Sequence, residues 1–155
     1  MPAPSADWLH DRPQIRTIRA AACDVNGVAR GKRMPIPSAV KMLTGGTRFP
    51  FSALNVDIWG EDIADSPLVF DSGDRDAILF PTERGFVPMP WLEAPTALLP
   101  IWMFHEDGRP YEGDPRHALS FVQKRFAEKG LTPVVAVELE FYLIDDSTRR
   151  LQVPI

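Results

Sequence analysis

The sequence predicts an α+β protein, in which a mixed β-sheet carries one short helix and a longer helix follows it. Three observations predict this class. Asn26-Gly27 separates two strand-like runs, and this dipeptide is the strongest short-range signal for a β-hairpin. A short helix over residues 39–43 is expected next, because Ser38 is a good N-cap and two glycines follow the segment. The apolar run 97–104 then has the length and composition of a buried strand.

The strands are expected in a fixed order along the chain. The prolines after residue 34 end the second hairpin strand, because proline cannot donate to a ladder. Residues 85–91 contain two prolines and can form at most an edge strand. The expected strands are 15–25, 28–34, 51–58, 77–80 and 97–104.

The sequence changes character near residue 112. Asp114 is a good N-cap, Pro115 suits the first helical position and Gly130 suits the position after the last turn. Between them, apolar residues recur at helical spacing and give the helix one apolar stripe: Ala118, Phe121, Val122 and Phe126. We therefore expect a flexible tail over 1–13, a first domain over 14–112 and the beginning of a second domain over 113–155.

Composition excludes several classes of protein. The chain has 155 residues with 17 basic and 21 acidic side chains, so its net charge is −4 and gives no general attraction to nucleic acid. Its single cysteine cannot form an internal disulfide. No apolar run approaches the roughly 20 residues that span a bilayer, and residues 1–13 do not resemble a signal peptide. We expect a cytoplasmic protein without a membrane or nucleic-acid partner.

The strongest chemical pattern is a pair of glutamates in an apolar segment, 132–144, that is predicted to be a strand. Side chains alternate along a strand, so Glu138 and Glu140 share one face, with Cα atoms about 6.5–7 Å apart. Two carboxylates so close repel each other unless a positive charge compensates them. Carboxylate oxygens suit Mg²⁺ or Mn²⁺. A solvated or salt-bridged strand face explains the same pattern, so the pattern alone leaves both interpretations open.

A resemblance favours the metal interpretation. The segment 134–143, Val-Val-Ala-Val-Glu-Leu-Glu-Phe-Tyr-Leu, resembles the Glu-x-Glu-Phe strand that opens the catalytic domain of glutamine synthetases. Upstream, 30–35 resembles that family's amino-terminal β-grasp hairpin, and 74–81 and 107–116 resemble further family segments in the expected order. Within the family, the chain looks most like the γ-glutamylpolyamine (γ-glutamylputrescine) synthetases. The implied fold is a β-grasp-like domain followed by the first helix and strand of the catalytic domain.

The resemblance also implies a reaction, in which ATP phosphorylates the γ-carboxylate of glutamate and an amine displaces phosphate. The first glutamate of the motif, here Glu138, would bind the metal near the nucleotide phosphates. The second, Glu140, would bind the metal beside glutamate. The implied cofactors are Mg²⁺ or Mn²⁺, with ATP as co-substrate. No nucleotide-binding motif occurs in this chain, so no residue is assigned to ATP.

One departure from the family pattern bears on the substrate. Ammonia-using members carry an Asp-Gly-Ser-Ser element, and the corresponding stretch 52–60 lacks it. An organic amine therefore becomes plausible as substrate, with Asp57 as the candidate to meet its cationic group. Two alternatives stay open: a glutamine synthetase that uses ammonia, and a stand-alone β-grasp interaction module without catalysis.

The resemblance further implies a homo-oligomer, in which the amino-terminal domain of one subunit packs against the catalytic domain of the next. An ATP-dependent ligase needs a nucleotide pocket and further metal ligands that these 155 residues do not supply. We therefore expect the isolated chain to be catalytically inactive.

Overall fold

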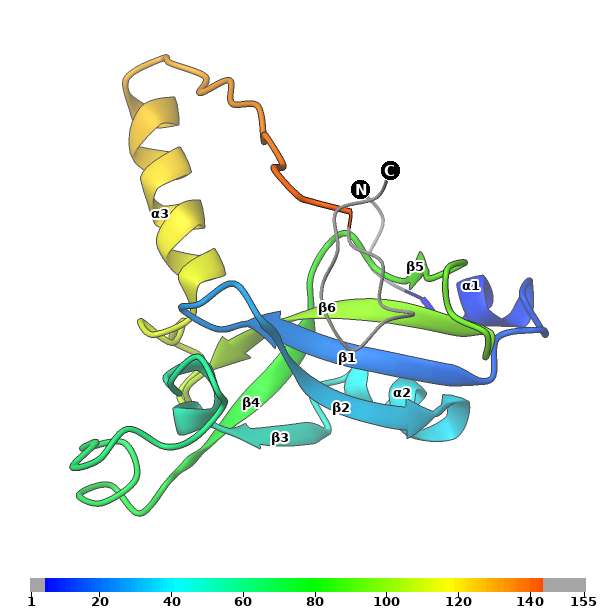
Figure 1. The fold of residues 1–155 in the computed structure, drawn as a ribbon, viewed down its shortest axis with the longest axis horizontal. Coiled ribbons are helices and arrows are strands. Elements are labelled where there is room, and N and C mark those ends of the chain that lie inside the picture. The colour runs from blue at the N-terminus through cyan, green and yellow to red at the C-terminus, as the bar shows by residue number, and fades with distance from the viewer. Residues whose placement is uncertain (1–4, 144–155) are drawn as a thin grey trace.

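The computed structural model describes residues 5–143. Over this range it contains one mixed sheet, a short helix before it in the chain, a helix packed beside it and a longer helix after it (Figure 1). The helices are α1 (Asp7–His10), α2 (Ile36–Met42) and α3 (Pro115–Glu128), with a 3-10 turn, η1, at Phe51–Leu54. The strands are β1 (Thr17–Cys23), β2 (Ala29–Pro35), β3 (Thr47–Pro50), β4 (Asp76–Pro81), β5 (Val87–Pro88) and β6 (Thr96–Phe104).

The sheet has the order β2-β1-β6-β4-β3, with β5 paired to β6 beside this path. β1 and β6 form the central pair and run parallel, with Ile18 opposite Ala97. All other pairs are antiparallel. A hairpin, a helix that follows it and a central parallel pair are the features of a β-grasp-like sheet. The predicted α+β class is therefore confirmed.

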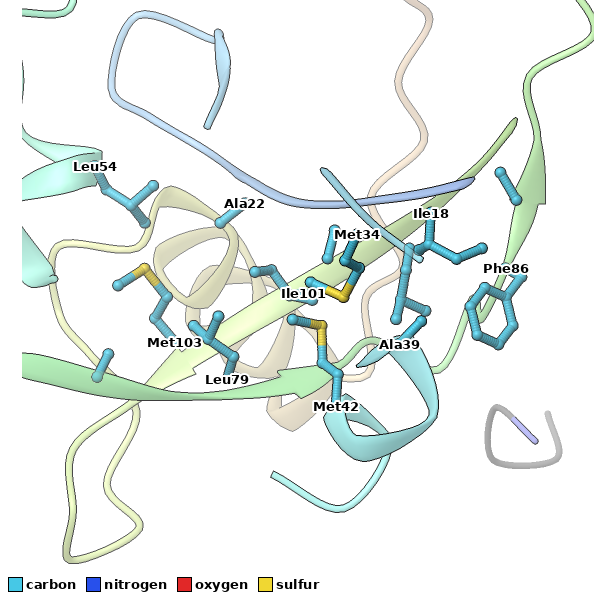
Figure 2. Packing of buried hydrophobic residues seen from close by; sticks show 14 of the residues in the cluster. Ile18, Ala22, Met34, Ala39, Met42, Leu54, Leu79, Phe86, Ile101 and Met103 are labelled. Atoms are coloured by element: carbon cyan, nitrogen blue, oxygen red, sulfur yellow. The ribbon is translucent and has the colours of Figure 1, made fainter. Parts of the chain in front are cut away.

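One face of the sheet forms the core, and α2 covers it (Figure 2). Alternate residues of the central strands point to this face, as strand geometry requires. From β1 and β6 these include Ile18, Leu99 and Ile101, all fully buried. Met42 of α2 packs onto them and is also fully buried. Methionine fills irregular space between a helix and a twisted sheet because its side chain is unbranched and flexible.

The hairpin is confirmed, but its turn differs from the type that Asn-Gly favours. A type I′ turn needs positive φ at both central residues. Here only Gly27 has positive φ, at 78°, and its N–H bonds to the carbonyl oxygen of Asp24 at 3.0 Å. The loop is therefore a three-residue connection, with Gly27 in the left-handed bulge position.

The helix after the hairpin begins earlier than Ser38 predicts. Its N-cap is Pro35 and Pro37 lies in the first turn, where its missing N–H would have no helical partner in any case. Ser38 is thus inside the helix, and the predicted Ser38 cap is wrong. The predicted stop is confirmed, because Gly45 has φ of 77° and bonds back to Met42.

The predicted strand 51–58 is wrong. The pairing segment is β3, just upstream, and Pro50 is followed directly by the 3-10 turn. In a 3-10 turn, residues three apart lie on the same side. Phe51 and Leu54 therefore both reach the core, whereas strand alternation would put one of them on the opposite face.

The two ends of the described chain behave differently. Within the segment predicted as a tail, α1 packs on the sheet domain: Leu9 is buried and Trp8 stacks on Phe86, with ring centroids 5.4 Å apart. At the other end, α3 stands away from the sheet (Figure 1) and buries no residue.

Across residues 5–143, none of the helices has the length and apolar character needed to cross a bilayer.

Candidate functional site

The acidic pair lies in the segment after α3. Residues 131–143 form neither helix nor strand, and Glu138 and Glu140 are both exposed. Their apolar neighbours are exposed as well, with Val135 at 86% and Leu139 at 82%. The predicted strand 132–144 is therefore wrong for residues 132–143, and Ile144 lies outside the described residues. The reason is pairing: a strand forms only beside another strand, and no described strand pairs with this segment.

The donor chemistry of the acidic pair fits a divalent ion, but the described residues supply only part of a site. Carboxylate oxygens of Glu138 and Glu140 are hard donors of the kind that Mg²⁺ and Mn²⁺ take. Mg²⁺ prefers six oxygen ligands, several of which are commonly waters. Over residues 5–143, no three His, Cys, Asp or Glu side chains gather closely enough to hold a metal ion. A metal site that used Glu138 and Glu140 would therefore need further ligands besides the side chains of residues 5–143.

The helix that leads to this segment is fixed to the sheet at its first turn. Asp114 is fully buried, and its Oδ1 accepts the N–H of Arg116 at 2.9 Å while its Oδ2 accepts the N–H of Met103 in β6 at 3.1 Å. His117 adds a second link, with Nε2 2.8 Å from the carbonyl oxygen of Met103, and its ring stacks on Trp102. The sequence-predicted N-cap is confirmed. These contacts set where α3 starts and in which direction it leaves the sheet.

Asp57 lies in a tight loop that its own side chain closes. Its Oδ1 accepts the N–H of Trp59 at 2.8 Å and the N–H of Glu61 at 2.9 Å. The Asp57 N–H donates to the carbonyl oxygen of Glu61, and the Gly60 N–H donates to the Asp57 carbonyl. No donor among the described residues bonds to Asp57 Oδ2. We call residues 56–62 the Asp57 loop. Its Trp59 side chain is 82% exposed.

The hairpin turn beside this loop contains an ion pair, buried on its aspartate side, that sequence reasoning missed. Asp24 is 1% exposed, and its Oδ1 accepts the N–H groups of Asn26 and Val28. Its Oδ2 accepts Nε of Arg30 at 2.8 Å. Burial alone would raise the pKa of Asp24, but the hydrogen bonds from Arg30, Val28 and Asn26 outweigh it and hold the pKa below its ordinary value. An aspartate two residues before Asn-Gly was the available signal, because aspartate commonly bonds to turn amides.

A hollow at the far end of β6 lies apart from the Asp57 loop and from the acidic pair. A cavity of about 390 Å³ opens there between Phe51, Arg75 and His105, and neither Asp57 nor the acidic pair lines it. His105 bonds to Glu112 at 2.8 Å, and this contact lowers the pKa of Glu112. The three predicted site residues, Asp57, Glu138 and Glu140, line neither this cavity nor the hollow between Pro110 and Lys124.

Comparison with known proteins gives a family match and several relatives. Residues 112–153 match the family described as glutamine synthetase, catalytic domain. The chain is 34% identical to γ-glutamylputrescine synthetase PuuA of Escherichia coli (strain K12), over 95% of the chain and 32% of that protein. It is 32% identical to glutamate–isopropylamine ligase of a Pseudomonas species, over 88% of the chain and 30% of that protein. Glutamine synthetase of Pyrococcus horikoshii is 27% identical over 91% of the chain and 29% of that protein.

Solved structures agree on the fold. A structure of GmaS without ligand superposes with a TM-score of 0.61 at 26% identity, over 81% of the chain and 26% of that protein. A glutamine synthase homologue gives a TM-score of 0.62 at 20% identity, over 74% of the chain and 27% of that protein, which speaks to the fold alone.

The sheet and the matched catalytic segment point to one class: the chain is similar to members of the glutamine synthetase family, and residues 112–153 match the catalytic domain of that family. Within that family it is similar to γ-glutamylputrescine synthetase, and the identity to that enzyme exceeds the identity to the Pyrococcus glutamine synthetase. The chain spans about a third of the length of the curated relatives it matches.

Proposed function

We propose that the chain is the amino-terminal portion of an ATP-dependent glutamate–amine ligase of the γ-glutamylputrescine synthetase type. The observation that carries this proposal is the Glu138-Leu139-Glu140-Phe141 motif, which lies inside the segment matching the glutamine synthetase catalytic domain. Two relatives whose names state an organic amine product or substrate, at 34% and 32% identity, support an amine over ammonia.

The reaction proposed for the whole ligase has two steps. The γ-carboxylate of glutamate is a poor electrophile, so one of its oxygens first attacks the γ-phosphorus of ATP, and ADP leaves. The resulting γ-glutamyl phosphate carries a good leaving group. The neutral nitrogen of the amine then attacks the acyl carbon, inorganic phosphate departs, and the nitrogen loses its extra proton. The products are the γ-glutamyl amide, ADP and phosphate.

In this proposal Glu138 and Glu140 hold divalent ions and transfer no proton. Glu138 serves the ion near the nucleotide phosphates, and Glu140 serves the ion beside glutamate. A bound Mg²⁺ or Mn²⁺ supplies positive charge against the crowded phosphate oxygens. The exposed acidic pair of the described chain is compatible with this role, because its carboxylates carry no salt bridge within residues 5–143.

Asp57 is proposed to meet the cationic form of the amine. Its Oδ1 is occupied by loop amides, which leaves Oδ2 as the acceptor that can face a substrate. Most of the Asp57 loop is exposed, so the loop by itself does not enclose a substrate. A binding site that includes Asp57 needs residues from another part of the protein. We propose that those residues belong to a neighbouring subunit of a homo-oligomer. We also propose that the chain divides into a first domain over 14–112 and the beginning of a second domain over 113–155. The isolated chain is then inactive. A cytoplasmic location belongs to the same proposal.

The test is phosphate release by the ligase encoded by the complete reading frame, with glutamate and ATP and with putrescine, ethanolamine or ammonium in parallel. The proposal expects the highest kcat/KM with an organic amine. Equal or better turnover with ammonium would replace it with glutamine synthetase. If none of the three amines supports phosphate release, the ligase proposal itself is wrong.

A further inference from the structure

The guanidinium of Arg30 lies against the Asp57 loop at Gly60. Gly60 has φ of +89°, and a Cβ placed on it would lie 2.5 Å from Nη1 of Arg30 and 3.3 Å from its Cζ. Any side chain at residue 60 would therefore occupy the space of the guanidinium. The guanidinium rests against the backbone of the loop. The Arg-Gly-Lys-Arg sequence that begins at Arg30 gives no sign of this contact.

Arg30 is held in this place from the other side. Its Nε donates to Oδ2 of Asp24 at 2.8 Å, and the Asp24 side chain is fully buried. Asp24 cannot turn away, because its Oδ1 accepts the amides of Asn26 and Val28 in the hairpin turn. A planar guanidinium bound at Nε keeps one orientation, which a lysine ammonium in the same place would not. The hairpin turn thus sets the position of the guanidinium.

Two further contacts join the same turn to the chain just before Gly60. Asn26 Nδ2 donates to the carbonyl oxygen of Val56 at 3.0 Å. The Val25 N–H donates to the carbonyl oxygen of Leu54 at 3.3 Å. These contacts fix the start of the Asp57 loop, but they do not reach its tip. The contact between Arg30 and Gly60 is the one among them that supports the tip.

We infer that Arg30 is a positioning residue for the amine site: it holds the Asp57 loop in the conformation that presents Asp57 Oδ2. This inference rests on the proposed role of Asp57. The loop closes on its own carboxylate through Trp59 and Glu61. A loop closed only by such local bonds opens readily, and packing against a fixed guanidinium restricts that opening. Arg30 does not touch the substrate in this account. It acts through Gly60 on Asp57.

The first test measures amide hydrogen exchange of Trp59 and Glu61 in the 155-residue chain. Arg30→Ala is expected to raise their exchange on the order of tenfold, because the loop loses the packing of the guanidinium together with its charge-assisted bond to Asp24. Arg33→Ala is the matched control, because Arg33 lies in the same strand, is exposed and makes none of the salt bridges within residues 5–143. Unchanged exchange at Trp59 and Glu61 in Arg30→Ala would overturn the inference.

A second variant separates loop support from loss of the ion pair. Gly60→Ala keeps Asp24 and Arg30 but displaces the guanidinium, and it should raise the same two exchange rates. Its control is Gly60→Ala made in the Arg30→Ala chain, where no guanidinium remains to be displaced. If Gly60→Ala raises the two exchange rates equally in both backgrounds, backbone strain at φ of +89° explains the effect and the contact with Arg30 does not.

The activity test uses the complete ligase. Arg30→Lys should raise KM for the amine about tenfold, while KM for glutamate and ATP stays within about twofold. Equal rises for all three substrates would indicate a general structural role and contradict the inference. The proposed ligase function and the proposed role of Arg30 fail in different ways. If no amine supports phosphate release by the unaltered enzyme, the proposed function is wrong. The exchange test on the Asp57 loop still decides whether Arg30 holds that loop.

Discussion

Replacing Asp114 tests how α3 is fixed to the sheet. The Asp114 side chain makes two separate contacts, one with the N–H of Arg116 inside the helix and one with the N–H of Met103 in β6. Both Asp114 and Met103 are fully buried, so water cannot replace a lost bond without a change of structure. Asp114→Ala removes both contacts, and Asp114→Ser keeps an acceptor only for the helix.

The expected magnitudes follow from these two contacts. Loss of an N-cap costs about 1 kcal/mol. A buried N–H left without an acceptor, here that of Met103, costs about 1–3 kcal/mol. Asp114→Ala should therefore lower the free energy of unfolding by about 2–4 kcal/mol, and Asp114→Ser by about 1–3 kcal/mol. For a domain of ordinary stability, about 5–15 kcal/mol, the larger loss is a substantial fraction.

The assay is urea unfolding of the 155-residue chain at pH 7, followed by circular dichroism and compared at constant m-value. Asp107→Ala is the control: Asp107 also accepts a backbone N–H two residues on, but it lies in an exposed turn and should change nothing measurable. A loss below about 1 kcal/mol for Asp114→Ala would refute the reasoning, because it would mean that the Met103 N–H finds another partner.

Three further predictions concern other parts of the chain. The hydrogen bonds of Asp24 hold its pKa below the unfolded value of about 3.9. The stabilisation that they give is present above that pH and is lost as the pH falls through the folded pKa. In urea titrations at a series of pH values, Asp24→Asn should therefore be less stable than the unaltered chain at neutral pH, and this difference should shrink on acidification. Met42→Ala should cost about 2–5 kcal/mol in the same unfolding assay, because Met42 is fully buried between α2 and the sheet, and a smaller cost would mean that the core collapses around the cavity. Phe121→Ser should change the stability of the isolated chain by less than about 0.5 kcal/mol, since Phe121 is 63% exposed, and a large loss would show that α3 packs on something in solution.

Local signals in the sequence predicted the elements whose structure is decided locally. The hairpin, the strands 77–80 and 97–104, and the Asp114 cap depend on short motifs or on apolar runs, and each is present. The misplaced elements depend on distant contacts. Residues 51–58 have strand-like composition, but the core needs Phe51 and Leu54 on the same side, and a 3-10 turn provides this.

The candidate site was predicted only in part, for the same reason. The alternation of apolar and acidic residues identifies Glu138 and Glu140 as unusual, but a strand needs a neighbour, and the described chain offers none to residues 132–143. Asp57 was selected by its place in the family pattern, and the structure adds that one of its oxygens closes a loop. The link from Asp24 through Arg30 to Gly60 joins residues more than thirty positions apart, which no local pattern can reveal.

The central claim is that the acidic pair binds divalent ions in a working ligase. Mn²⁺ affinity and phosphate release should be measured on the complete enzyme with Glu138→Gln, Glu140→Gln and, as control, Glu128→Gln, an exposed glutamate at the end of α3. The account predicts that each of the first two lowers Mn²⁺ affinity by at least about tenfold and reduces turnover, while the control matches the unaltered enzyme. A double variant, Glu138→Gln with Glu140→Gln, that keeps both ion affinity and turnover would contradict it.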